Sequence, residues 1–183
     1  DREHLSPAEV LALIEAAGAR GRFRERDRSL LLMMFRHGLR ATEAASLKWE
    51  AVDLKAKKMK VSRSKKSKGG DHPLQEDEVQ ALITLRNIYP CSDYVFPAER
   101  GGHLTISGMQ KMFSRIAREA GLEVKIHSHM LRHSTASFLL NQGVPIQDIK
   151  AWLGHVNLEN TIGYLPVTPN AFAKFDWDWK QDR

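Results

Sequence analysis

The stretch Ser128-His129-Met130-Leu131-Arg132-His133-Ser134 places a histidine and an arginine at the start of a helix, which we expect to run over His129–Gln142. Ser128 is a suitable N-cap, so His129 falls in the first turn, and Arg132 shares its face at i,i+3. The apolar residues that follow predict that the rest of the helix is buried. Free N–H groups and the helix dipole attract phosphate to a helix N-terminus. The stretch therefore predicts a rigid anion site at the exposed end of a buried helix.

A metal site is the alternative for the same stretch, with His127, His129 and His133 as ligands. His129 and His133 are spaced i,i+4 and can share a metal, but His127 points elsewhere on a helix. No glutamate follows in the zinc-protease pattern, so we prefer phosphate. We interpret His133 as a hydrogen-bonded core residue that supports the site.

A second arginine lies in His37-Gly38-Leu39-Arg40-Ala41-Thr42-Glu43. Gly38 is typical of a helix C-terminus, which puts Arg40 in the loop before the next helix. Such a guanidinium can clamp a phosphate with two hydrogen bonds. The alternative is a surface arginine paired with Glu43, and the local sequence alone favours that reading.

Two further candidates follow near the C-terminus. A helix over Pro145–Leu153 is predicted to stop at Gly154, so His155 emerges at a turn. Tyr164 precedes Pro166, which ends a short helix and leaves the tyrosine near its frayed end. Either residue alone would be read as structural. Together with two arginines and His129, they indicate cleavage of a nucleic-acid backbone through a covalent phosphotyrosine, because a tyrosine hydroxyl can attack phosphorus.

The positive charge is concentrated in one segment. Net charge is +6, from 28 basic and 22 acidic residues, and eight of the basic residues lie between Lys55 and Lys68 with no acid among them. We expect a β-hairpin whose lysine can protonate a leaving oxygen, with Lys65, Lys66 and Lys68 as candidates. Apart from the lysine that donates the proton, the basic residues of the segment are expected to contact DNA phosphates. The expected contacts are Lys57, Lys58, Lys60, Arg63, Lys66 and Lys68. A solvated hairpin or a disordered basic loop is the alternative.

The chain as a whole is predicted to be mainly α with a small antiparallel β-sheet, an α+β fold. Ser6-Pro7-Ala8-Glu9 is a capping box that starts the first helix, and Asp27 is expected to cap the second, which runs to His37. The other expected helices are 42–47, 75–88, 106–120 and 158–165. The expected strands are 52–54 and 59–62, with a return near 72–74.

Length and composition favour one domain over residues 1–183. The one cysteine, Cys91, excludes an intrachain disulfide. No signal peptide is visible, and no apolar run approaches the roughly 20 residues that span a bilayer. We therefore expect no membrane association and a reducing compartment. The aromatic residues of the C-terminal stretch 172–179 predict that it packs on something.

The chain resembles the tyrosine recombinase/integrase family. The matching blocks are His37–Glu43 with Leu47-Lys48-Trp49, then His129–His133, then Leu153-Gly154-His155, then Tyr164. They cover essentially the whole chain, in the family's order and spacing. Arg63-Ser64-Lys65-Lys66, followed by His72-Pro73-Leu74, looks most like the short recombinases that switch fimbrial promoters. The family's hairpin pattern picks Lys65, although the adjacent lysines keep that choice open.

The resemblance implies the DNA breaking-rejoining fold and a role for each matched residue. Tyr164 would attack the scissile phosphate and form a 3′-phosphotyrosine. Arg40 and Arg132 would hold the nonbridging oxygens. His129 would assist proton transfer, His155 would hydrogen-bond the phosphate, Lys65 would protonate the leaving 5′-oxygen, and Glu43 would support the site. No cofactor and no metal are required.

The resemblance also implies partners and a place in the bacterial cytoplasm or nucleoid. The substrate would be double-stranded DNA at a specific recombination site, with a homotetramer in the synaptic complex and a monomer or weak oligomer in the free protein. Many family members carry a separate N-terminal DNA-clamping domain, which we expect to be absent from residues 1–183, either because they are a catalytic fragment or because the enzyme is naturally short. The C-terminal tail, residues 167–183, is expected to dock on a neighbouring protomer. Two alternatives stay open: DNA relaxation of the type IB topoisomerase kind, and a DNA-binding regulator without catalytic activity.

Overall fold

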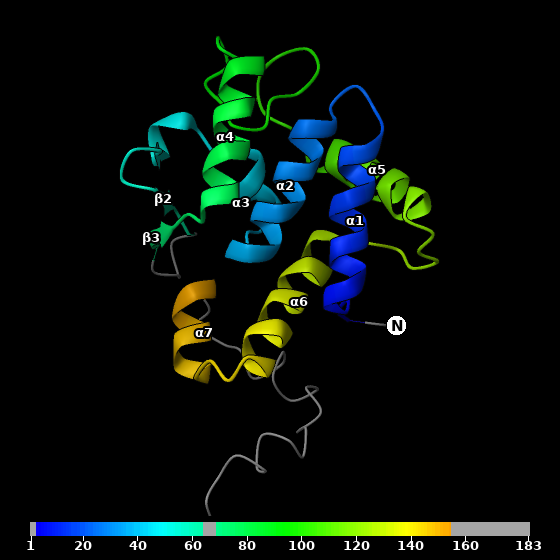
Figure 1. The fold of residues 1–183 in the computed structure, drawn as a ribbon, viewed down its shortest axis with the longest axis vertical. Coiled ribbons are helices and arrows are strands. Elements are labelled where there is room, and N and C mark those ends of the chain that lie inside the picture. Colours follow the sequence, from blue (N-terminus) through cyan, green and yellow to red (C-terminus); the bar gives the residue numbers. More distant parts are fainter. Residues whose placement is uncertain (1–2, 64–68, 155–183) are drawn as a thin grey trace, which may run out of the picture.

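The computed structural model describes residues 3–63 and 69–154 of the chain. Within them the chain is mostly helical and carries one small antiparallel sheet (Figure 1). The helices are α1 (Pro7–Ala19), α2 (Arg24–His37), α3 (Ala41–Ala45), α4 (Glu76–Ile88), α5 (Ile106–Glu119), α6 (Ser128–Asn141) and α7 (Ile146–Leu153), with a 3₁₀ turn η1 (Trp49–Ala51). The strands are β1 (Val52–Asp53), β2 (Lys58–Val61) and β3 (Gly70–Pro73). The α+β expectation is confirmed.

Local sequence sets the start of α1 as predicted. The Ser6 hydroxyl accepts a hydrogen bond from the Glu9 amide at 3.3 Å, and the Glu9 carboxylate accepts one from the Ser6 amide at 2.8 Å. Pro7 occupies the first helical position, where its missing N–H costs nothing.

The prediction that Asp27 caps α2 is wrong. The helix begins at Arg24, and Asp27 lies inside it. Its buried carboxylate accepts from Arg26 at 2.7 Å and from Arg115 of α5 at 2.7 Å. Asp27 therefore ties α2 to α5, a tertiary role that a capping pattern does not reveal.

Most of the apolar core lies between the helices α1, α2, α4, α5 and α6, and a separate small cluster of Ala136, Ile149 and Leu153 joins α6 to α7. In Figure 1, α6 and α7 lie together at one end of the molecule, and the loop after α4 lies at the other. The carboxyl end of α2 points toward the α6–α7 end, because Gly38 there approaches Leu153. None of the helices in the described ranges combines the length and apolar content that a membrane span requires.

The sheet has the order β1-β2-β3 with antiparallel pairing throughout. Side chains alternate along β2, so Met59 and Val61 are buried while Lys58 and Lys60 are exposed. His72 of β3 faces Met59 in the register and is buried with it. The sheet thus has one face against the core and one face toward solvent, on which Lys58 and Lys60 stand opposite Asp53 and Asp71.

A candidate phosphate site of three arginines

Arg40 stands at the junction between α2 and α3. Gly38 ends α2 in the left-handed conformation, with φ of 56°, and Arg40 takes the N-cap position of α3 in extended backbone. The Arg40 guanidinium donates to Glu43 Oε1 at 2.7 Å, while its amide donates to Glu43 Oε2 at 2.9 Å. The Arg40 side chain is 26% exposed. Pairing with Glu43 therefore holds the guanidinium in place and still leaves part of it at the surface.

Arg132 comes to the same junction from α6. It is 2% exposed and donates to the backbone carbonyls of Gly38 and Leu153, at the carboxyl ends of α2 and α7. Helix carboxyl ends carry partial negative charge, which offsets part of the cost of burying the cation. Burial, with Arg40 and Arg63 nearby, lowers the pKa of Arg132 to about 9. The group remains cationic at neutral pH.

The two helix ends that Arg132 joins are pressed together. A Cβ on Gly38 would lie 2.1 Å from Leu153 Cδ2, so the close approach requires glycine at that position as well as its positive φ. Gly154 ends α7 in the same left-handed way, with φ of 62°.

Arg63 is the third arginine, and the structure buries this side chain, which we predicted to contact DNA phosphates. Its side chain is 1% exposed and donates to Glu43 Oε2 at 2.5 Å. Arg63 lies two residues beyond the end of β2, and its bonds to Glu43 and to the His37 and Trp152 carbonyls hold the side chain inside the fold. The alternation of Met59 and Val61 in the sequence could have suggested that Arg63 faces inward, but we gave more weight to the positive charge of the segment.

Positive charge predominates in this cluster among the residues that the structure describes. The guanidiniums of Arg40, Arg63 and Arg132 lie around the carboxylate of Glu43. Burial is the main reason that the pKa of Arg63 is lowered, and the charge of Arg40 adds to it. An anion placed beside the cluster would relieve this repulsion, and guanidiniums match the oxygens of a phosphate.

His127 and His129 lie at the exposed start of α6, and His133 follows one turn later. The N-cap is His127 and not Ser128 as predicted, because the His127 ring accepts from the Met130 amide at 3.2 Å. His129 is exposed, as expected for the first turn, and its ring lies edge-on to that of His133 with centroids 6.4 Å apart. His133 is half-buried, and burial is the first cause that lowers its pKa. In the described part of the chain, no group of three His, Cys, Asp or Glu is placed to hold a metal ion.

A buried polar network lies beneath the junction, and the sequence reasoning did not find it. His37 of α2 contacts His72 of β3 through their Nδ1 atoms at 3.1 Å and Glu78 of α4 through Nε2 at 2.8 Å. The Trp152 ring of α7 stacks on His72 with centroids 3.8 Å apart and donates its indole N–H to the Arg36 carbonyl at 2.9 Å. The network therefore joins the sheet to the same two helix ends that the arginines join.

The charge state of the network follows from its burial. Burial lowers the pKa of His72 to about 3, with further lowering by the charges of His37 and Arg63. Burial alone would raise the pKa of Glu78. The hydrogen bond from His37, together with the Gln75 amide and the charge of Arg36, outweighs burial and holds the pKa of that carboxyl below its usual value. The Glu78 carboxylate is therefore ionised and accepts a hydrogen bond from His37 Nε2, and His72 is neutral at pH 7.

Several predicted site residues lie outside the described residues: Lys65, Lys66, Lys68, His155 and Tyr164. The three lysines lie in the segment that follows Arg63, and His155 and Tyr164 lie in the segment that follows Gly154. Arg63 and Gly154 both belong to the arginine cluster, since a Cβ on Gly154 would lie 2.9 Å from Arg63 Cγ.

The predicted DNA-contacting lysines that are described lie on the solvent side of the sheet. Lys57 pairs with Glu76 at 2.6 Å and Lys58 with Asp71 at 3.1 Å, and all four side chains are exposed. Lys60 is exposed as well. Exposed pairs of this kind are weak and exchange readily with other ions.

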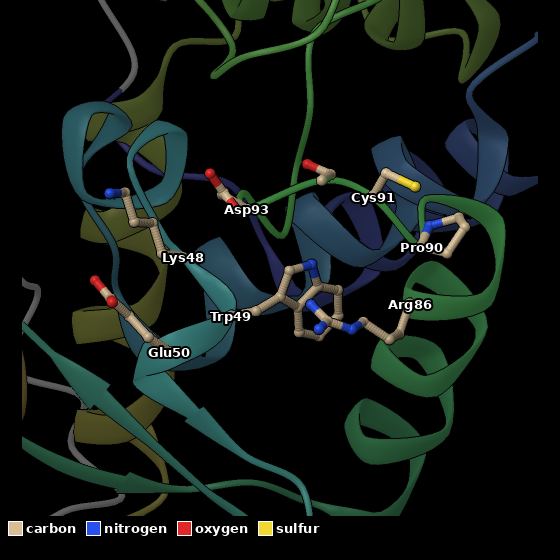
Figure 2. Close-up of a pocket in the computed structure, with 8 residues that line it drawn as sticks. Lys48, Trp49, Glu50, Arg86, Pro90, Cys91 and Asp93 are labelled. Atoms are coloured by element: carbon tan, nitrogen blue, oxygen red, sulfur yellow. The ribbon is translucent and has the colours of Figure 1, made fainter.

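Two pockets in the described part of the chain share Lys48 and Glu50 in their lining. Figure 2 shows one of about 410 Å³, between Trp49 and the end of α4, in which Arg86 lies over the Trp49 ring at 4.9 Å from its centroid. The Trp49 indole N–H is buried there without a hydrogen-bond partner among the described residues. A smaller pocket of about 130 Å³ reaches Glu43 and is also lined by Lys60 and Ser62. The smaller one touches the arginine cluster at Glu43.

Comparison with known proteins identifies the family of the chain. Residues 3–170 match the family described as the Phage integrase family. FimB of Escherichia coli K12, a type 1 fimbriae regulatory protein, is 36% identical over 100% of this chain and 92% of its own length. The tyrosine recombinase XerD of Pseudomonas putida is 34% identical over 89% of this chain and 57% of its own.

A solved structure shares the fold. The XerH site-specific recombinase bound to its difH substrate before cleavage superposes with a TM-score of 0.75 at 26% identity, over 87% of this chain and 49% of that one. The chain thus spans about half of XerH. With the family match over nearly the whole sequence, the chain belongs to the phage integrase family, among the tyrosine recombinases.

Proposed function

We propose that the chain cleaves and rejoins double-stranded DNA at a specific recombination site through a 3′-phosphotyrosyl intermediate. The observation that carries the proposal is the cluster of Arg40, Arg63 and Arg132 around the carboxylate of Glu43. Donors held in place before the reaction stabilise charge that develops on the phosphate at little reorganisation cost. The similarity to XerH, which was solved on its DNA substrate, supports DNA as that phosphate's source.

The proposed nucleophile is Tyr164, one of three tyrosines in the chain. Tyr89 and Tyr94 line a pocket together with Phe23, at the amino end of α2. The arginines lie at the carboxyl end of that helix, and a helix of 14 residues is about 21 Å long. Two of the three tyrosines are thus remote from the cluster, and Tyr164 is the remaining one.

The proposed reaction exchanges one phosphodiester for another. The Tyr164 oxygen forms a bond to phosphorus as the bond from phosphorus to the 5′-oxygen breaks, and His129 assists removal of the tyrosine proton. Lys65 supplies a proton to the leaving 5′-oxygen. A 5′-hydroxyl of the same or another strand then attacks the phosphotyrosine and releases Tyr164. Because each step replaces one phosphodiester bond by another, no ATP and no cofactor are needed.

The other residues have supporting roles in this proposal. Arg40 and Arg132 hold the nonbridging oxygens, and His155 hydrogen-bonds the phosphate. Glu43 orients Arg40 through the two contacts described above, and His133 supports His129 from the next turn of α6.

Assembly and location extend the proposal. Lys57, Lys58 and Lys60, with Lys66 and Lys68, contact DNA phosphates without reading sequence. Four copies act together on paired sites, and the tail 167–183 docks on a neighbouring protomer. We place the reaction in the bacterial cytoplasm, where the DNA lies.

The test is a nicked suicide substrate that carries the chain's own recombination site. Wild-type protein should form an adduct that survives SDS, and Tyr164→Phe should abolish it while Tyr94→Phe keeps it. An adduct that persists in Tyr164→Phe would refute the assignment. Relaxation of supercoiled plasmid without a specific site would favour the topoisomerase alternative, and binding without any adduct would favour a DNA-binding regulator.

A further inference from the structure

Arg63 occupies the one place where the sheet, the α2–α3 junction and the end of α7 meet within the described residues. Besides Glu43 Oε2 at 2.5 Å, it donates to the Trp152 carbonyl at 2.8 Å and to the His37 carbonyl at 3.2 Å. A longer contact reaches the Gly38 carbonyl at 3.4 Å. One guanidinium thus contacts three separate elements.

These contacts complement those of its neighbours. Arg40 takes one oxygen of Glu43 and Arg63 takes the other. The Gly38 carbonyl accepts from Arg132 and lies within reach of Arg63. Each arginine expected to hold the phosphate therefore shares an acceptor with Arg63.

We propose that Arg63 is a positioning residue for the phosphate clamp. It fixes Glu43, and through Glu43 the guanidinium of Arg40, against the helix ends that hold Arg132. Arg63 is itself too buried to serve as the surface DNA contact, with a side chain that is 1% exposed. The inference rests on the proposed function, since it assigns a role within that reaction.

Lysine cannot replace arginine in this place. An ammonium is a compact group on a flexible stem, whereas the planar fork of a guanidinium can hold a carboxylate and two carbonyls in fixed directions. The Arg63 stem also packs closely on Gly154, where a Cβ would lie 2.9 Å from Cγ. Arg63→Lys should keep the charge and lose the alignment.

The experiment compares Arg63→Lys with a matched variant, Arg26→Lys. Arg26 is also a buried arginine, with a side chain 7% exposed, and it donates to Asp27 and to the Pro97 carbonyl. It lies near the amino end of α2, away from the cluster. Both variants lose a buried fork, so both lower thermal stability, but only Arg63→Lys should affect the chemistry.

The readouts are the single-turnover rate of adduct formation on the suicide substrate and the affinity for the same DNA. For Arg63→Lys we expect a rate lower by about tenfold to a hundredfold, with the Kd within about twofold of wild type. Arg26→Lys should keep both values within about twofold. A methylphosphonate at the scissile position removes a nonbridging charge, so the Arg63→Lys defect should shrink to below about threefold there.

Three results would overturn the inference. They are an Arg63→Lys rate equal to wild type, an equal loss in Arg26→Lys, and an equal defect on diester and methylphosphonate. If Arg63→Lys does not fold, Arg63→Gln takes its place, and failure of both to fold would make Arg63 a purely structural residue. If wild type leaves the methylphosphonate uncut, the diester comparison decides. A wild type that forms no adduct on the diester would instead refute the proposed function.

Discussion

The buried arginines and the exposed lysines carry the same charge in two different settings. Arg63 and Arg132 are held by backbone carbonyls at the ends of α2 and α7, with side chains almost fully out of water. Lys57 and Lys58 stand in water beside Glu76 and Asp71. A buried charge is fixed in direction and costly to place, whereas an exposed charge is cheap and screened by salt.

The difference separates catalysis from affinity. Donors in fixed directions stabilise a transition state more than a bound ground state, so the arginines should govern the rate. Exposed lysines neutralise phosphates and release counterions, so they should govern binding and its dependence on salt.

Replacing Arg40 should change the rate most. We expect Arg40→Lys to lower the single-turnover rate by about a hundredfold to a thousandfold, because a fixed donor to the nonbridging oxygens is lost. The Kd for DNA should stay within about threefold, since the charge is kept. Rapid-quench measurement of the adduct gives the rate, with Lys60→Gln as the control. A loss confined to Kd would mean that Arg40 belongs with the surface lysines.

Gly38→Ala tests the framework that holds the arginines. The added Cβ would lie 2.1 Å from Leu153 Cδ2, and alanine would have to adopt the positive φ of this position. We therefore expect a loss of about 2–4 kcal/mol in the free energy of unfolding. Gly143→Ala is the matched control, with φ of 81° and no atom within 4 Å of its Cβ. It should lose only about 1 kcal/mol. Equal losses in urea unfolding would show that the contact between the ends of α2 and α7 is unimportant.

The network under the cluster should make stability depend on pH through His72. Its pKa is lowered to about 3 in the folded state, so the unfolded chain binds the extra proton first as pH falls. This contribution is therefore complete above pH ~6.5 and is lost toward pH ~3, at no more than about 1.4 kcal/mol per pH unit. His72→Gln should flatten the slope of unfolding free energy against pH between pH 6 and pH 4. An unchanged slope would place the titration elsewhere.

The exposed lysines should have the smallest effect on chemistry. In Lys58→Gln/Lys60→Gln, the slope of log Kd against log salt should fall by about one to two, while the rate at saturating DNA stays unchanged. Filter binding at several salt concentrations measures the slope. A large loss of rate at saturation would contradict the division between the two sets of charges.

Much of the fold was predictable because its signals are local. The capping box at Ser6, the left-handed glycines 38 and 154 and the alternation of β2 all depend on residues near in sequence. The residues Arg40 and Arg132 were also predicted, one at a helix junction and one on a buried helix.

What the sequence did not reveal depends on contacts between distant segments. Arg63 was predicted to contact DNA phosphates because it lies in the basic segment, and the sequence did not reveal that its side chain is buried against Glu43. His37, His72 and Trp152 meet only because three elements fold onto one junction. Partners 35 or more residues apart leave no local pattern in a single sequence.

The most direct test is to locate the covalent bond itself. Wild-type protein is trapped on the suicide substrate, the DNA is trimmed by nuclease, and the modified peptide is identified by mass spectrometry. We predict a nucleotide linked through its 3′-phosphate to Tyr164. A nucleotide on Tyr89, on Tyr94 or on a serine would show that the three arginines serve a different chemistry.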